Sequence, residues 1–599
     1  MKYRADYSKS PLLFVDILKV DDSDLQKKMP SIYLKGIFST NFKKEIKYRL
    51  YKRYYDINLD RVLDTLTTMD ERNEHESVFM NLLKDPNKWA LTGEIEQFKK
   101  IKLQMSPSQE EISKKILERR LQIVWGPPGS GKTHFLSLFT TWYLSEYKCK
   151  LTKNYIVGVT TVTAFTRAAI ENLLDRISTV QKQHHKTSDF DIIYLADDSK
   201  KNHFNGIKKC RAWSLWSKIG INDKPIVIGS TVWDWFKVRK SWNSGWVGCD
   251  IMIIDEGSQL LVSDASIAIE CLNPKTGKLI VAGDHMQFGP ILQATYPTFS
   301  LNHPLIFGSI LQCLMRKDNG NVIHEENLIL LEGQKHNFGP LTAQLKENWK
   351  MNKELNSFFQ MIYGKDCKIS PLKETKLLPS LLFEDPDSRI KRILSPDSAI
   401  ILVKLMARNK GLRNNPRTLE DKFLQTEVEV VEKIYISINN VEETKKPSLL
   451  IVTPSHRQRI AIQLKLKRYP NINLQIIDTT EKMQGKETAD IVIACFGFYN
   501  LDKTSKKEFV FKINRWNVAT SRARSKVIII TTDKMLDPED IEISINKKMR
   551  EGRAFLNMIE NWVQNNDNNI GEKRKRENIG IIKWTISVDE KNKEMIKFF

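Results

Sequence analysis

GPPGSGKT, at residues 126–133, is the stretch that decides the fold of this chain. It fits the pattern G-x-x-x-x-G-K-T, in which glycines let backbone amide groups point inward at phosphates. The apolar run LQIVW (121–125) precedes it, and HFLSLFTTWYL (134–144), which is typical of a helix, follows it. A glycine-rich surface turn is the alternative, but a strand, a loop and a helix in this order favour a phosphate-binding loop.

Short apolar runs repeat this pattern along the rest of the chain. From about residue 105 they alternate with helical stretches, and a second such series starts near residue 400. Buried strands separated by helices indicate parallel sheets that are covered on both faces. We therefore predict two tandem α/β domains, with strands at YIVGV (155–159), PIVIG (225–229), IMIID (251–255), LIVAG (279–283), AIILVKL (399–405), SLLIVT (448–453), LQIID (474–478), DIVIACF (490–496) and KVIIIT (526–531).

The domain organisation predicted from these series has four regions. Residues 1–104 form a small accessory region, 105–340 the first α/β domain, 341–540 the second, and 541–599 a charged C-terminal tail. The tail contains the basic run KRKR (573–576), which resembles a weak nuclear import signal. Short basic runs are common, so the location could be the nucleus or the cytoplasm.

Composition and charge narrow the class of protein. The 599 residues are 41% hydrophobic and 28% charged, as in globular proteins, and no apolar stretch is long enough to span a membrane. The net charge of +22 favours nucleic acid as a partner, although a lysine-rich genome would give the same surplus. The seven cysteines are widely spaced, so we expect neither a zinc site nor an iron–sulfur cluster. We expect an intracellular protein without membrane contact; protein partners are not indicated.

Acidic and amide side chains follow two of the predicted strands. IMIIDEGSQ (251–259) ends in Asp255 and Glu256. Beside a phosphate-binding loop, the first acid holds Mg²⁺ together with the Thr133 hydroxyl, and the second polarises the attacking water. Lys132 reaches the β- and γ-phosphates, and Gln287, in LIVAGDHMQFGP (279–290), is a candidate sensor of the γ-phosphate. We therefore predict a site for ATP and Mg²⁺, with Thr133 and Asp255 as metal ligands.

About eight motifs occur here in the order found in the superfamily 1 helicases, over roughly residues 105–535. The chain resembles the branch of the nonsense-mediated-decay RNA helicase and the replication nuclease–helicase, which have AAA-type helicase/ATPase domains. The resemblance implies two RecA-like P-loop NTPase domains with ATP and Mg²⁺ between them. It also implies an accessory barrel or stalk before the first domain. No nuclease is recognised, which leaves two readings: a relative without it, or a piece of a longer chain.

The resemblance implies which residues contact the nucleotide. Gln109 in SPSQEE (106–111) matches an adenine-reading glutamine, and Arg522 in NRWNVATSRARS (514–525) matches an arginine finger. LKENWKMNKEL (345–355) and DTTEKMQGKE (478–487) match two further motifs. The implied nucleotide-binding residues are Gln109, Gly126, Pro127, Pro128, Gly129, Ser130, Gly131, Lys132, Thr133, Trp349, Lys350, Gly485, Glu487 and Arg522, with Lys132, Asp255, Glu256, Gln287 and Arg522 as the catalytic set.

The same resemblance implies contacts with single-stranded DNA or RNA. TAFTRAAIENLL (163–174), VIGSTVW (227–233) and IVTPSHRQ (451–458) match motifs that touch the bound strand. The implied residues are Thr163, Thr166, Ser230, Thr231, Thr453, Pro454, Thr479 and Thr480. Six tryptophans also lie among basic residues between Trp213 and Trp246, most clearly in KKCRAWSLWSK (208–218). They could stack on bases, although most tryptophans pack in cores.

Lys350 departs from the family pattern, which has arginine at this position. Lysine keeps the charge and loses the planar fork, so turnover is either unchanged or slowed. Two functions therefore remain open. The first is an ATP-dependent helicase or translocase, for which the resemblance implies 5′-to-3′ movement. The second is an ATP-gated nucleic-acid clamp or scaffold with weak turnover.

Overall fold

A computed structural model of the chain has two compact units, Met1–Ile57 and Asn58–Phe599. The first contains an antiparallel pair of strands, β1 (Asp16–Asp21) and β2 (Ser31–Lys35). The structure describes residues 16–21, 31–35, 57–71, 77–93, 95–99, 103–147, 159–184, 190–196, 206–215, 224–241, 248–292, 305–323, 337–365, 367–369, 387–407, 416–442, 446–469, 473, 476–483, 488–498, 504–537, 546–570 and 581–586.

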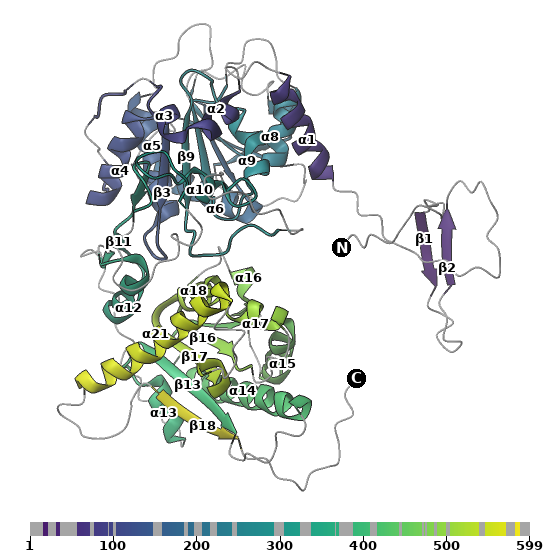
Figure 1. Cartoon of the computed structure of the whole chain (residues 1–599), viewed down its shortest axis with the longest axis vertical. Coiled ribbons are helices and arrows are strands. Elements are labelled where there is room, and N and C mark those ends of the chain that lie inside the picture. The colour runs from purple at the N-terminus through teal and green to yellow at the C-terminus, as the bar shows by residue number, and fades with distance from the viewer. Residues whose placement is uncertain are drawn as a thin grey trace. The chain divides into compact units, whose positions relative to one another are not determined.

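A parallel eight-stranded sheet forms the first α/β domain of the second unit (Figure 1). Its strand order is β10-β3-β9-β8-β4-β7-β5-β6, and every neighbouring pair is parallel. Four of the predicted strands match within one residue, and β5, β6 and β10 are additional. The predicted strand at 155–159 shares only Val159 with β4, and its residues 155–158 lie outside the described residues. The strands are β3 (Leu121–Trp125), β4 (Val159–Ala164), β5 (Asp191–Leu195), β6 (Lys208–Cys210), β7 (Ile226–Gly229), β8 (Ile251–Asp255), β9 (Lys278–Gly283) and β10 (Thr342–Gln344).

Helices cover both faces of this sheet because alternate strand residues point to opposite sides. Val124 and Ile253 pack in one cluster, and Ile123 and Ile254 pack in another. The first cluster includes helices α4 (Pro107–Glu118), α5 (Lys132–Tyr147) and α6 (Arg167–His184). The second includes α8 (Val232–Lys240), α9 (Val262–Ile269) and α10 (Ile310–Leu314).

Three helices before residue 104 also pack on the first domain: α1 (Ile57–Asp70), α2 (Val78–Lys84) and α3 (Pro86–Ala90). Glu270, after α9, accepts hydrogen bonds from Ser77 Oγ at 2.7 Å and from the Phe79 amide at 2.8 Å. The Arg120 guanidinium lies 4.2 Å from the centre of the Trp89 ring. Part of the region expected to be accessory is therefore built into the first domain.

A parallel six-stranded sheet forms the second α/β domain, in the order β15-β14-β16-β17-β13-β18 (Figure 1). The strands are β13 (Ile400–Ala407), β14 (Leu449–Thr453), β15 (Ile477–Thr479), β16 (Ala489–Phe496), β17 (Ala523–Thr532) and β18 (Ile581–Ile586). One face packs on α13 (Ser388–Leu394), α14 (Pro416–Asn439) and α15 (His456–Leu466). The other packs on α12 (Lys353–Tyr363), α18 (Ile513–Thr520), α19 (Asp533–Leu536) and α21 (Lys547–Ile570). Two parallel sheets covered on both faces confirm the predicted α/β class with tandem RecA-like domains.

The region expected to be a charged tail contributes two of these elements. Helix α21 packs Phe555 and Leu556 into the core, and β18 pairs with β13 from Leu402↔Ile581 to Ala407↔Ile586. The basic run KRKR (573–576) lies outside the described residues. None of the helices in the described residues is long and apolar enough to cross a bilayer. No group of three or more metal-binding side chains occurs in these residues either.

Candidate functional site

The loop Gly126–Thr133 joins β3 to α5 and has the conformation that its glycines allow. Gly129 and Gly131 have φ angles of +82° and +77°, which side chains other than glycine's rarely adopt. A Cβ atom at Gly126 would lie 2.0 Å from Lys132 Cγ. The Lys132 ammonium donates a 2.7 Å hydrogen bond to the Gly126 carbonyl, so it lies across the loop. The glycine-dependent backbone of the loop and the Lys132 ammonium group therefore lie together at the end of β3.

Asp255 and Glu256 lie at the end of β8, next to this loop. The Thr133 side chain hydrogen-bonds to Asp255, and burial together with the charge of Glu256 raises the pKa of Asp255 to about 7. The paired hydroxyl and carboxyl oxygens are the ligand types that Mg²⁺ prefers. Glu256 has a φ angle of 52°, the only left-handed non-glycine backbone in the part of the chain that the structure describes. Such strain concentrates at functional sites.

Asp284 is the centre of a buried hydrogen-bond network after β9. Its carboxylate accepts hydrogen bonds from Gln287 Nε2 at 3.0 Å and from the Tyr363 hydroxyl at 2.8 Å. Asn517 in α18 donates to the same Tyr363 hydroxyl at 2.6 Å and to the Met286 carbonyl at 2.9 Å. The network therefore links the first domain to a helix of the second. Tyr363 and Asn517 were not predicted, because their partners are 79 and 231 residues away in the chain.

Arg522 comes from the second domain, immediately before β17, and meets Gln287. Its Nη2 group lies 3.3 Å from Gln287 Oε1. Burial lowers the pKa of Arg522, while nearby Glu256 opposes this shift. The structure thus brings Gln287, Glu256 and Arg522 into one site, although they are far apart in the sequence. An arginine in this position can reach charge that develops on a phosphoryl group held by the first domain.

Residues 348–352, which we name the strap, connect the loop to the arginine segment. The Trp349 amide donates to the Gly129 carbonyl at 2.9 Å, and the Lys350 ammonium donates to the Ser521 carbonyl at 2.6 Å. The Asn352 amide donates to the Arg524 carbonyl at 2.9 Å. A Cβ atom at Gly131 would lie 3.3 Å from the Trp349 ring, so the indole covers the loop. The strap therefore contacts the phosphate-binding loop at one end and the segment around Arg522 at the other.

The residues at this site fit a nucleoside triphosphate with Mg²⁺. Ser130 Oγ, Glu256 Oε2, Trp349 Nε1 and Arg522 Nε are buried without a hydrogen-bond partner among the described residues. Burial and the charges of Arg522, Arg524 and Lys132 hold the pKa of Lys350 well below its ordinary value. Lys132, Lys350 and Arg522 therefore lie near one another, and such a group of cations suits the phosphates of a nucleoside triphosphate.

Two family models match the chain, and each is described as an AAA domain. One covers residues 109–292 and the other covers residues 330–534, so they divide the site between them as the two α/β domains do. An uncharacterized ATP-dependent helicase of Methanocaldococcus jannaschii is 21% identical over 503 residues, covering 72% of this chain and 68% of that protein. The chain belongs to superfamily 1 of the helicases. It is an ATP-dependent enzyme of this class, as the sequence predicted.

A longer plant protein is also similar to this superfamily 1 chain. The DNA replication ATP-dependent helicase/nuclease JHS1 of Arabidopsis thaliana is 21% identical over 463 residues. The match covers 75% of this chain and 30% of that protein, so the chain spans less than a third of the plant protein's length. Among solved structures, the DEAD-box helicase Mss116 bound to ssRNA and UDP-BeF has 13% identity and a TM-score of 0.33, covering 79% of this chain and 76% of that one.

Gln109 of this superfamily 1 chain is buried at the start of α4. Its side chain and that of Ser106 cap the helix reciprocally, with the Ser106 amide 3.0 Å from Gln109 Oε1. Gln109 Nε2 is buried and has no hydrogen-bond partner among the described residues. Glu347, which no sequence motif indicated, accepts hydrogen bonds from Ser106 and from Ser108 and joins this helix to the strap. Gly485 and Glu487 lie outside the described residues.

The residues expected to touch nucleic acid lie at the carboxyl ends of parallel strands. Thr163 and Ser230 follow paired positions of β4 and β7, and Thr453 pairs with Thr479 between β14 and β15. Thr163, Ser230, Thr231, Thr453, Pro454, Thr479 and Thr480 are buried, whereas Thr166 is exposed. Phe165 beside Thr166 is 43% exposed and was not predicted. Phe165 is therefore a candidate for contact with a ligand because of its exposure in the structure, which no sequence pattern indicates.

The tryptophan tract divides into exposed and buried rings. Trp213 is 67% exposed in the short helix η2 (Ala212–Ser214), which follows edge strand β6. Trp235 is fully buried in α8 and belongs to the core. Trp216, Trp242 and Trp246 lie outside the described residues. Trp233 is partly buried and packs against the same core, so Trp213 is the exposed ring among those of the tract that the structure describes.

Proposed function

We propose that this chain hydrolyses ATP when it binds single-stranded DNA or RNA, and that the cycle moves it 5′ to 3′ and separates duplexes. The proposal rests on the hydrogen bond between Arg522 of the second domain and Gln287 of the first. A ligand that favours this contact favours the closed arrangement of the domains, and hydrolysis removes that preference. The direction of movement rests on the resemblance to the superfamily 1 branch.

Each residue of the site has a role in this cycle. Lys132 and the loop amides bind the phosphates, and Thr133 and Asp255 hold Mg²⁺, which when bound offsets phosphate charge. Glu256 takes the proton of the attacking water, and Gln287 orients that water. Arg522 stabilises the charge that develops on the transferred phosphoryl group. Gln109 and Trp349 hold the adenine, with Gly485 and Glu487 as further nucleotide contacts.

The strand would lie across the carboxyl ends of both sheets. Thr163, Thr166, Ser230 and Thr231 supply contacts from the first domain, and Thr453, Pro454, Thr479 and Thr480 supply them from the second. Contacts of this kind grip the backbone and do not read sequence. The net charge of +22 supports the same partner.

The test is strand displacement with DNA and RNA duplexes that carry either a 5′ or a 3′ single-stranded tail. We expect displacement from 5′ tails and a strand-stimulated ATPase rate that Lys132→Ala abolishes. ATP turnover without displacement of any 5′-tailed substrate would reject the helicase and its polarity.

An ATP-gated clamp with weak turnover is the second candidate, and the hydrogen bond from Lys350 to Ser521 favours it. This bond uses one of the three donors of the ammonium group, which the resemblance would place at the γ-phosphate. Tight strand binding with little stimulated turnover, together with turnover restored by Lys350→Arg, would support the clamp over the motor.

A further inference from the structure

Glu427 is a buried carboxyl group that the proposed hydrolysis cycle does not use. It lies in α14, and its side chain is 0% exposed. Its Oε2 atom accepts a hydrogen bond from Gln458 Nε2 at 2.9 Å, and its Oε1 atom accepts one from the Gly497 amide at 2.7 Å. No cation pairs with it among the described residues. A buried carboxylate without a cation is costly unless such donors satisfy both of its oxygens.

The two donors belong to the turns that follow neighbouring strands. Gln458 is in the first turn of α15, and its Oε1 accepts a 2.8 Å hydrogen bond from Ser455 Oγ. Thr453, at the end of β14, donates to the Ser455 carbonyl at 3.2 Å. Gly497 follows β16, which pairs with β14. A Cβ atom at Gly497 would lie 2.8 Å from Glu427 Oε1, so this approach requires glycine.

We propose that Glu427 is a positioning residue for nucleic acid: its carboxylate holds the Thr453–Ser455 turn and the Gly497 turn in the arrangement that grips the backbone of a single strand. The inference rests on the proposed function, in which Thr453 and Pro454 contact the strand. Glu427 itself would touch no ligand, because it is enclosed beneath both turns.

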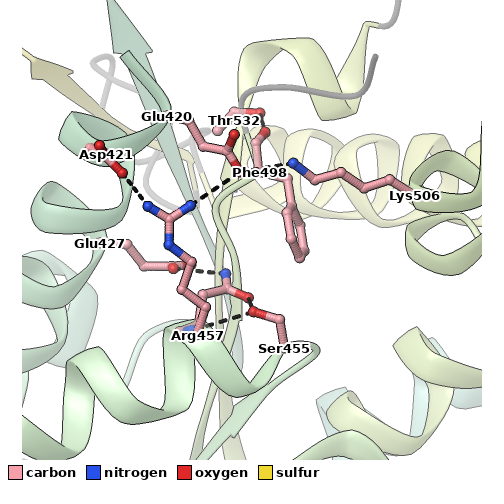
Figure 2. Close-up of polar contacts among 9 residues, drawn as sticks. Glu420, Asp421, Glu427, Ser455, Arg457, Phe498, Lys506 and Thr532 are labelled. Carbon is pink, nitrogen blue, oxygen red and sulfur yellow. Dashed lines mark hydrogen bonds and ion pairs between the residues drawn. The ribbon is translucent and has the colours of Figure 1, made fainter. Parts of the chain in front are cut away.

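The charged groups around Glu427 are occupied with one another, as Figure 2 shows. Arg457 in α15 pairs with Glu420 and Asp421, and Lys506 in α17 (Thr504–Val510) lies 2.8 Å from Glu420. Among the described residues, a further ionisable neighbour is the Cys495 thiol of β16, and burial together with the charge of Glu427 raises its pKa well above its ordinary value. Glu420, on the same helix but in this outer network, provides a matched control.

Protonation of Glu427 should loosen the two turns. Burial raises its pKa to about 7, although the hydrogen bonds from Gln458 and Gly497 oppose the shift. A protonated carboxyl carries one O–H donor, which would face an N–H donor and break one of the two contacts. The affinity for a single strand of nucleic acid should therefore fall as the pH falls through about 7.

The effect on stability has the opposite sign. A carboxyl whose pKa is higher in the folded than in the unfolded chain stabilises the fold by binding a proton. The contribution of Glu427 to the free energy of unfolding thus grows as the pH falls from about 7 towards the ordinary pKa of a glutamate side chain. Strand affinity and stability move in opposite directions, which a purely structural carboxyl would not produce.

The experiment compares the full-length wild type with Glu427→Gln and Glu420→Gln at pH 6, 7 and 8. Fluorescence anisotropy with a labelled single strand gives affinity, and melting temperature and the KM for ATP are measured alongside. We expect wild-type affinity to fall by roughly tenfold from pH 8 to pH 6, the most that one such proton can give. Glu427→Gln should bind weakly at every pH, with a flat profile, an unchanged KM for ATP and no loss of stability at pH 8. Glu420→Gln should keep the wild-type slope.

Wild-type affinity and slope in Glu427→Gln would overturn the inference and leave the proposed function intact. A wild type that binds neither DNA nor RNA at any pH would overturn both. If Glu427→Gln fails to fold, Gln458→Met removes the same contact from the other side. A folded Gln458→Met variant with wild-type affinity would also reject the role of Glu427.

Discussion

The ammonium group of Lys350 donates a 2.6 Å hydrogen bond to the carbonyl oxygen of Ser521, the residue immediately before Arg522. A side chain expected to meet phosphate therefore also fixes the backbone that carries the arginine finger. The strap that contains it is bonded at its other end to the Gly129 carbonyl of the phosphate-binding loop. The position of Arg522 thus depends on a contact from the strap, as well as on the sheet from which it comes.

Lys350→Met tests this dependence, because methionine keeps the length of the side chain and removes its donor. We expect kcat to fall roughly tenfold to hundredfold, as small misplacements of catalytic groups do. The KM for ATP should change less, and the melting temperature should stay near that of the wild type. A normal kcat with a raised KM would show that Lys350 acts on the nucleotide alone.

The pH dependence of ATP affinity provides a second test of Lys350. Burial and neighbouring cations hold its pKa well below its ordinary value, so it is charged below that lowered pKa and neutral above it. Because ATP is an anion, its affinity should decline as the pH rises through this lowered pKa. Lys350→Arg should flatten the decline, since arginine remains protonated. Equal slopes in titrations of the two proteins would contradict the assignment.

The left-handed backbone of Glu256 predicts a difference between two inactive variants. Glu256→Gln and Glu256→Gly should each reduce ATP hydrolysis by roughly 10²- to 10⁴-fold, because both lack the general base. Glycine adopts a φ angle of 52° without the strain of about 1–2 kcal/mol that a side chain causes there. The glycine variant should therefore melt at a higher temperature than the glutamine variant. The reverse order would show that the backbone of Glu256 is not strained.

Arg522 and Arg524 form a matched pair two positions apart. Arg522→Ala should lower kcat on the order of 10³-fold or more and change ATP binding only a few-fold, as expected of an arginine finger. Arg524 pairs with Asp490 at 3.1 Å on the partly exposed side of β17, and Arg524→Ala should change kcat less than threefold or so. Single-turnover rates and nucleotide affinities measured on both variants show whether only Arg522 is required for catalysis. Similar losses in the two would leave Arg522 without a specific role.

Trp213 should contribute to strand binding through stacking. Trp213→Ala should weaken binding of a long single strand by about 1–3 kcal/mol, and Trp213→Phe should restore most of it. Trp235→Ala, in the buried ring, should instead lower the melting temperature. If Trp213→Ala binds short and long strands with wild-type affinity, the exposed ring does not contribute to strand binding.

Local sequence patterns predicted much of the fold, because strand, loop and helix signals act over a few residues. LQIVW and IMIID form β3 and β8 with the predicted bounds, and the loop between β3 and α5 has the expected glycine geometry. Residues within single motifs, such as Asp255 and Glu256, could be proposed from local sequence in the same way. Their motif fixes both the residue type and its place at a strand end.

Contacts over long sequence separations could not be predicted in this way. Lys350 and Ser521 are 171 residues apart, and Glu427 and Gly497 are 70 apart. No periodicity in the sequence indicates which helix residue will face which strand end. The residues 541–599 were misleading for a related reason, since their charges conceal an amphipathic helix whose apolar side packs on the second sheet.

Strand β18 has a consequence for any shortened version of this protein. It is the last strand of the second sheet and lies beside β13, although it comes from residues 581–586. A chain that ended before residue 581 would leave the amide and carbonyl groups of Leu402–Ala407 open along an apolar strand. Such an unprotected edge templates pairing with other molecules. By pairing with β13, strand β18 therefore protects the protein from self-association. A truncated protein would be prone to aggregate even with its catalytic residues intact.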